Sequence, residues 1–122
     1  IDVNEDPALI GKKYWEKEGY DKNIEFVQGR ALDILEKENE SFDFVFIDAD
    51  KKGTLDYFKK SLSLQNQNGL IIIDNIWLKG SVLEPHREMH FSRLEFLKFI
   101  DKEKSLNKTF LPIGDGILLV TK

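Results

Sequence analysis

FDFVFIDADKKG at residues 42–53 and NGLIIIDN at residues 68–75 share one pattern, an apolar run that ends in a carboxylate. The apolar runs are rich in Phe, Val, Leu and Ile, which indicates two buried parallel strands. Asp48 follows the first run, and Asp74 and Asn75 follow the second. We expect these polar ends to lie side by side, at the sheet edge where ligands bind in open α/β folds.

The side chains expected at this edge are hard oxygen donors, with Lys51 close by in sequence. A carboxylate at the end of an apolar strand needs a partner or a metal ion. Carboxylate and amide oxygens suit Mg²⁺ or Ca²⁺ better than zinc. Two alternatives stay open: an Asp after a strand often caps the next helix, and Lys51 could be a solvated charge at a helix start.

Short apolar runs alternate with amphipathic stretches, which predicts βαβ order and an α/β fold. We expect strands at 1–3, 23–28, 42–47 and 70–73, helices at 7–18, 30–37, 54–64 and 91–102, and a hairpin of 108–112 with 116–121. Gly114 and Asp115 form the expected hairpin turn. The fold predicted is therefore a parallel sheet that ends in an antiparallel hairpin.

Composition bounds the class of protein. The chain has 122 residues, 41% hydrophobic and 33% charged, as expected for at most one small soluble domain. A net charge of -4 offers no electrostatic attraction for nucleic acid. The absence of Cys excludes disulfides and thiolate chemistry and fits a cytoplasmic protein. No apolar run approaches the roughly 18 residues of a membrane span, so we expect neither a signal peptide nor a membrane partner.

Several segments together resemble one known family. They are IDVNED (1–6), VQGRAL (27–32), FDFVFIDADKKG (42–53), NGLIIIDNIWLKGSV (68–82) and FLPIGDGILLVTK (110–122). The chain is similar to the C-terminal part of the cation-dependent O-methyltransferases, the caffeoyl-CoA and catechol O-methyltransferase family. The resemblance implies a Rossmann-like class I methyltransferase sheet. It also implies that residues 1–122 are a partial domain whose N-terminal portion, with the first strand and the glycine-rich loop, is absent.

The resemblance also assigns roles to residues of this chain. Asp48, Asp74 and Asn75 match the divalent-metal ligands, for Mg²⁺ or another cation such as Ca²⁺ or Mn²⁺. Lys51 matches the lysine proposed as catalytic base. The residues that we expect to bind the cofactor S-adenosylmethionine are Asp2 (at the ribose), Ala31 (at the adenine), Asp48 and Asp50.

The function implied is methyl transfer from S-adenosylmethionine to a hydroxyl of a small vicinal dihydroxy aromatic, assisted by a divalent metal. The family is often dimeric, so a homodimer is expected. One alternative is a non-catalytic or truncated methyltransferase-fold remnant. A second is a phosphoacceptor receiver domain, which fits less well because Asp74-Asn75 stands where a receiver carries Ser or Thr.

Three further features of the sequence matter for the structure. The histidine pair and Trp77 each allow two interpretations, and the third feature concerns the core. His86 and His90 are spaced i, i+4, which could suit a metal on a helix, but Pro85 and an irregular setting favour an exposed or lid position. Trp77 is either a loop anchor or part of the acceptor wall. Apolar periodicity places three aromatic residues in the core: Phe91, Phe96 and Phe99.

Overall fold

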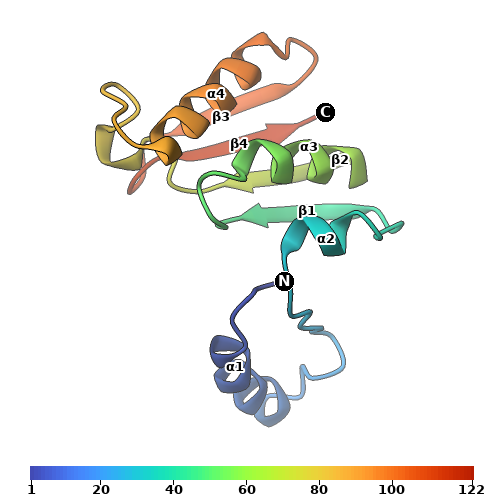
Figure 1. Ribbon diagram of the computed structural model, residues 1–122. Coiled ribbons are helices and arrows are strands. Elements are labelled where there is room, and N and C mark those ends of the chain that lie inside the picture. Colours follow the sequence, from blue (N-terminus) through green and yellow to red (C-terminus); the bar gives the residue numbers. More distant parts are fainter. The chain divides into compact units, whose positions relative to one another are not determined.

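The computed structural model describes residues 1–122, which form two compact units, residues 1–38 and 39–122 (Figure 1). The larger unit contains β1 (Phe42–Ile47), α3 (Thr54–Leu64), β2 (Gln65–Ile73), the 3₁₀ turn η1 (Leu78–Gly80), α4 (Glu88–Lys102), β3 (Asn107–Leu111) and β4 (Ile117–Thr121). None of the four α-helices of the chain is both long enough and apolar enough to cross a membrane.

The larger unit has one four-stranded sheet of order β1-β2-β4-β3. β1 and β2 are parallel, with Ile47 opposite Ile73, and β4 is antiparallel to both β2 and β3. α3 connects the two parallel strands, as the βαβ pattern predicts. The predicted α/β class, with parallel strands followed by an antiparallel hairpin, is confirmed.

Two elements begin three or more residues earlier than predicted, and the other helices and strands that differ do so by one or two residues at an end. β2 begins at Gln65, not at residue 70, because Gln65 already pairs with Phe42 before the register shifts. The intervening residues bulge out, and the Gln65 side-chain amide closes the bulge by donating to the Gly69 carbonyl at 2.5 Å. α4 begins at Glu88, three residues earlier than expected, where Glu88 forms an ion pair with Lys52.

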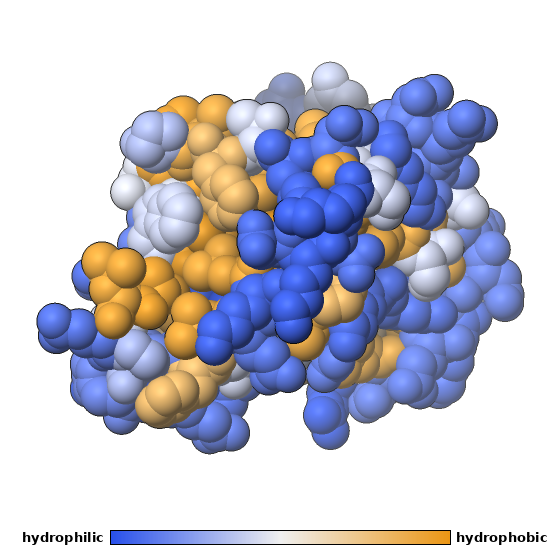
Figure 2. Space-filling model, turned by 90° about the horizontal axis from the view of Figure 1, so that it is seen from above, coloured by the Kyte–Doolittle hydropathy of each residue, from blue (hydrophilic) through white to orange (hydrophobic).

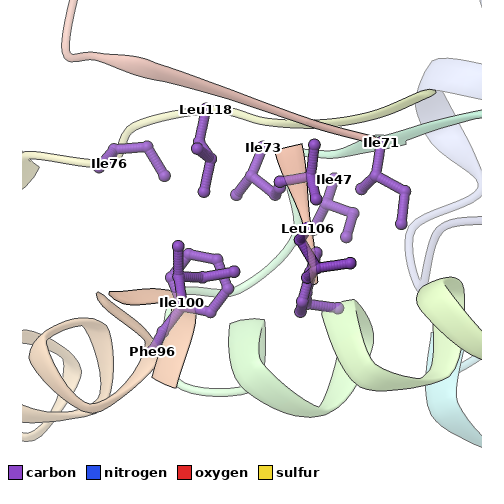
Figure 3. Packing of buried hydrophobic residues seen from close by; sticks show 10 residues of the cluster. Ile47, Ile71, Ile73, Ile76, Phe96, Ile100, Leu106 and Leu118 are labelled. Atoms are coloured by element: carbon purple, nitrogen blue, oxygen red, sulfur yellow. The ribbon is translucent and has the colours of Figure 1, made fainter. Parts of the chain in front are cut away.

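The core of the larger unit lies between the sheet and the helices. Side chains of β1, β2 and β4 point toward α4 (Figure 3), where they meet Phe96 and Ile100. The ring of Phe58 on α3 lies edge-on to Phe96, with 5.5 Å between centroids. The prediction that Phe96 lies in the core is confirmed, and the half-buried Phe99 packs against the core. Phe91 is 56% exposed because it faces away from the sheet, so its predicted core position is wrong.

The opposite face of β1 is open. Phe44 and Phe46 are 56% and 55% exposed, whereas the alternating Ile47 is buried. The apolar run predicts that both faces of β1 are buried, and this prediction is wrong for the face that carries Phe44 and Phe46. Apolar residues also gather at several places on the surface seen in Figure 2, between hydrophilic ones.

The smaller unit contains α1 (Asp6–Lys17) and α2 (Ala31–Leu35). α1 agrees with the predicted helix, and Gly19 follows it with a φ of +76°. The strands predicted at 1–3 and 23–28 are reduced to a single parallel bridge between Asp2 and Gln28. Two backbone hydrogen bonds form this bridge: the Asp2 amide donates to the Val27 carbonyl, and the Gly29 amide donates to the Asp2 carbonyl. Two bonds are too few to make a strand.

Candidate functional site

The ends of β1 and β2 lie side by side, as the sequence predicts. The Asp74 amide donates to the Ile47 carbonyl at 3.1 Å, so the chain leaves both strands at the same level. Asp48 and Asp74 each come one residue after the paired Ile47 and Ile73. Two carboxylate side chains thus start from adjacent backbone positions at the carboxyl edge of the parallel strands, where α/β folds bind ligands.

Lys51 and Asp48 form an ion pair at this edge. The Lys51 Nζ atom lies 2.7 Å from Asp48 Oδ1. The Lys51 side chain is 19% exposed and that of Asp48 is 50% exposed. The ammonium is therefore partly enclosed, and the carboxylate keeps a face open to solvent.

Asp50 has a local structural role. Its Oδ1 accepts the amides of Lys52 at 3.1 Å and Gly53 at 2.9 Å, in the turn that leads into α3. Its Oδ2 accepts a short hydrogen bond from the Tyr57 hydroxyl. The Tyr57 bond is the main reason why the pKa of Asp50 lies below its usual value of 3.8, and the two amides and Lys51 lower it further, against burial. Asp50 therefore closes the turn before α3, but no side chain caps the helix itself, whose N-cap residue is Gly53.

Asp74 and Asn75 are half-buried and form a tight corner. Asp74 Oδ1 accepts the Asn75 amide at 2.6 Å, and Asn75 adopts a left-handed conformation with φ of +55°. Asn tolerates this region better than most residues. The left-handed residue turns the chain sharply at the end of β2, so the side chains of both residues stay at the sheet edge.

The loop after Asn75 docks on the β3–β4 turn. The Ile76 amide donates to the Gly116 carbonyl at 3.0 Å, and the Trp77 amide donates to the Asp115 carbonyl at 2.9 Å. The Lys79 amide donates to Asp115 Oδ1 at 2.6 Å. We call this contact, residues 76–79 on residues 115–116, the loop–turn junction.

Trp77 anchors this junction. Its ring stacks on Phe110, with centroids 5.6 Å apart and 27° between planes. Gly116 has φ of +82°, and a Cβ at this position would overlap the Trp77 indole. The interpretation of Trp77 as a loop anchor is therefore supported by its contacts.

The donor set at the strand ends fits a hard divalent cation. The His, Asp and Glu side chains alone form no group of three that could hold a metal ion. A site here therefore needs the Asn75 amide oxygen together with Asp48 and Asp74. Two carboxylates and one amide oxygen are ligands that Mg²⁺ and Ca²⁺ accept, and two negative charges balance a divalent ion.

The predicted cofactor residues Asp2 and Ala31 lie in the smaller unit and come close to each other there. The Gly29 amide donates to the Asp2 carbonyl at 2.9 Å, and Ala31 begins α2 two residues later. The Asp2 side chain accepts the Asn4 amide at 2.8 Å and is exposed. Its second carboxylate oxygen is thus available for a ligand hydroxyl.

The two histidines occupy different environments. Their rings are 4.6 Å apart in an edge-to-face arrangement. His86 is exposed, as expected, but His90 lies within α4 and is 5% exposed, so the expected exposed position is wrong for His90. Burial lowers the pKa of His90 below 6.5, and the charges of His86 and Arg87 lower it further.

Arg93 near this edge is not identified by the sequence patterns. It is 1% exposed on α4, one turn before Phe96. The only sequence signal is an arginine on the apolar face of an amphipathic helix, at i-3 from Phe96. An arginine in this pattern can also extend its guanidinium to solvent, so the sequence does not predict that Arg93 is buried.

Comparisons with known proteins agree with this geometry. The family model described as O-methyltransferase matches residues 1–122. The probable caffeoyl-CoA O-methyltransferase 1 of Dictyostelium discoideum is 38% identical over 99% of this chain and 56% of its own length. Caffeoyl-CoA O-methyltransferase 3 of Nicotiana tabacum is 36% identical over 98% of this chain and 55% of its own.

The same relation appears among solved structures. An O-methyltransferase from Bacillus cereus, solved in complex with SAH, is 30% identical, with a TM-score of 0.84, over 98% of this chain and 60% of its own. The chain spans about half the length of the curated relatives it matches. These matches exclude the receiver-domain alternative, since the whole chain is accounted for by one other family. The chain belongs to the O-methyltransferase family.

Proposed function

We propose that this chain is the part of an S-adenosylmethionine-dependent O-methyltransferase that carries the metal ligands. The reaction proposed is methyl transfer to one hydroxyl of a small vicinal dihydroxy aromatic, either a catechol or a caffeoyl-CoA-like ester. Support comes from family membership and from relatives named caffeoyl-CoA O-methyltransferases.

One observation carries the proposal. The Asp74 amide binds the Ile47 carbonyl, which brings Asp48, Asp74 and Asn75 to one sheet edge. Lys51 lies at the same edge, with its ammonium 2.7 Å from Asp48. Oxygen donors and a basic side chain are therefore combined at one place.

The roles follow from this arrangement. Asp48, Asp74 and Asn75 would hold Mg²⁺ or another divalent cation, which would supply Lewis-acid activation of an acceptor hydroxyl. A catechol hydroxyl titrates near 10, so little of it is ionised at neutral pH. Lys51 would receive the proton of that hydroxyl in its neutral amine form, once the cation rather than the ammonium is paired with Asp48. As the O–CH₃ bond forms, the S–CH₃ bond of the sulfonium breaks and S-adenosylhomocysteine leaves.

We assign cofactor binding to Asp2 and Ala31, with Asp48 and Asp50 contributing. The relative from Bacillus cereus was solved with SAH, the product of this cofactor. An exposed Asp2 carboxylate suits the ribose hydroxyls, and the start of α2 at Ala31 suits the adenine. Asp50 is already bonded to three donors, so its contribution is through the shape of the turn before α3.

The proposal has three further parts. The partner is a small hydroxylated aromatic, the protein acts in the cytoplasm, and it forms a homodimer. Neither nucleic acid nor a membrane is part of the proposal.

The test is metal binding and turnover of Asp48→Ala, Asp74→Ala and Lys51→Ala. Asp56→Asn, an exposed carboxylate on α3, is the control. We expect Mn²⁺ binding, followed by electron paramagnetic resonance, to be lost in both Asp variants and kept in Lys51→Ala and in the control. Unchanged Mn²⁺ binding in Asp48→Ala and Asp74→Ala would refute the ligand assignment.

Turnover is measured with labelled S-adenosylmethionine and with caffeoyl-CoA or catechol as acceptor. Lys51→Ala should slow the chemical step by about 10²-fold or more while cofactor affinity stays nearly intact. A wild-type protein that binds neither Mn²⁺ nor cofactor while folded would favour the non-catalytic alternative.

A further inference from the structure

The sequence predicts Asp115 as a hairpin-turn residue, but its carboxylate bonds outside the turn. The turn closes through its backbone, where the Gly116 amide donates to the Ile113 carbonyl at 3.0 Å. The Asp115 Oδ1 atom accepts the amide of Lys79 at 2.6 Å, from a residue 36 positions earlier in the chain. An Asp that only stabilised its own turn would bond to backbone nearby in sequence. The Asp115 carboxylate therefore acts on the loop that follows β2.

The loop that Asp115 binds has an unfavourable backbone conformation. Leu78, Lys79 and Gly80 follow one another with φ of +47°, +54° and +81°. Glycine adopts left-handed φ without a steric penalty, whereas Leu78 and Lys79 need support from their surroundings. Residues in such conformations persist where the surrounding structure fixes them, and they gather at functional sites. The hydrogen bond from the Lys79 amide to Asp115 fixes the middle residue of this left-handed run.

The backbone on both sides of Asn75 is also held by distant segments. On one side, the Asp74 amide donates to the Ile47 carbonyl of β1. On the other side, the Ile76 amide donates to the Gly116 carbonyl at 3.0 Å, and the Ile76 side chain is fully buried in the core (Figure 3). Asn75 itself has a left-handed φ of +55°. The conformation of Asn75 thus depends on β1 before it and on the β3–β4 turn after it.

We propose that Asp115 is a positioning residue. Its carboxylate holds the left-handed loop on the β3–β4 turn and thereby fixes the orientation of Asn75 as a metal ligand. The part that concerns metal binding rests on the proposed function. The part that concerns the loop does not, because hydrogen bonds within the chain define it.

The first test is NMR of Asp115→Ala on the metal-free chain. One reporter is hydrogen exchange at the Trp77 and Lys79 amides, which make the junction bonds. The other is the three-bond coupling between the amide and α protons of Asn75, which depends on φ. We expect the two amides to exchange about tenfold faster or more and the Asn75 coupling to change, with interior amides of β4 unaffected. Wild-type values for the two amides or for Asn75 would overturn the proposal.

Two further variants separate positioning from a general loss of stability. Asp115→Asn keeps an oxygen acceptor for the Lys79 amide, so it should restore most of the protection and the wild-type Asn75 coupling. Ile100→Val removes a buried methylene from the core, outside the junction. It should lower the free energy of unfolding and leave the Asn75 coupling unchanged. If Ile100→Val altered Asn75 as much as Asp115→Ala does, Asp115 would have a merely structural role and the proposal would fail.

Metal affinity is the second test, with Mn²⁺ binding followed by electron paramagnetic resonance. Asp115→Ala should weaken Mn²⁺ binding about 10-fold or more, as the loss of other residues that orient ligands does, and Asp115→Asn should bind nearly as wild type. Wild-type affinity in Asp115→Ala would refute the role in ligand positioning. If the wild-type chain binds no Mn²⁺ while the NMR results hold, the proposed function fails, whereas the role of Asp115 in holding Asn75 stands.

Asp115→Glu covers the case in which Asp115→Ala does not fold. This variant keeps the charge but moves the carboxylate by one methylene relative to the Lys79 amide. We expect faster exchange at the Lys79 amide and a changed Asn75 coupling. Wild-type values for both would overturn the proposal.

Discussion

The two strand ends that carry the candidate ligands are held in different ways. After β1, the turn is stabilised by Asp50, whose partners all lie within seven residues of it. After β2, the loop is held by the β3–β4 turn, and Lys79 and Asp115 are 36 residues apart. One edge of the sheet thus combines a locally determined half with a half that needs the rest of the unit.

This difference separates the two kinds of failure that substitutions can cause. A change in the turn after β1 should alter local stability and leave the loop–turn junction intact. A change in the β3–β4 turn should displace Asp74 and Asn75 even though neither residue is altered.

The largest effect is expected for Gly116→Ala. Its left-handed φ costs a side chain about 1–2 kcal/mol, and the added Cβ would overlap Trp77, for a total of about 3 kcal/mol. Gly114→Ala is the matched control, because Gly114 also has positive φ but no atom within 4 Å of an added Cβ. Urea unfolding of both variants measures the difference. Equal losses would show that the Trp77 contact does not constrain the junction.

A smaller effect is expected for Asp50→Asn. Loss of a charged acceptor for two amides and the Tyr57 hydroxyl should lower the free energy of unfolding by about 1 kcal/mol. Exchange at the Trp77 and Lys79 amides should stay at the wild-type rate, because the two halves of the edge are held separately. Faster exchange at those amides would contradict the separation.

The smallest effect concerns pH. The folded-state pKa of Asp50 is below 3.8, so its contribution to stability is present above pH 3.8 and is lost as pH falls through the folded-state value. The difference in unfolding free energy between wild type and Asp50→Asn should therefore be constant from pH 7 to about 5 and shrink below about 3.8. Urea titrations across this range measure it. If this difference in unfolding free energy grew on acidification, the predicted direction of the pH dependence would be wrong.

The order of elements could be predicted from the sequence because it depends on local patterns. β1 and α3 have the predicted bounds, and the hairpin lies around Gly114 and Asp115 as expected. Apolar runs and turn residues act over a few positions, so they are visible without the fold. The juxtaposition of Asp48 with Asp74 also follows, since parallel neighbours joined by one helix end at the same edge.

Other features could not be predicted from the sequence. The bulge that starts β2 at Gln65 depends on pairing with Phe42, and the single bridge at Asp2 depends on how the smaller unit packs. The burial of His90 depends on the early start of α4. Each is set by a partner distant in sequence, and local propensity carries no information about such partners.

The sequence by itself determined the α/β order, the family and the residues that supply oxygen donors at the sheet edge. Only the tertiary structure decided which carboxylate closes the turn before α3, that Trp77 packs on Gly116, and that Arg93 is buried. The physical reason is the range of the interactions. Hydrophobic periodicity and turn preferences depend on a few neighbouring residues. The docking of one loop on another and the pairing of charges depend on segments that only folding brings together.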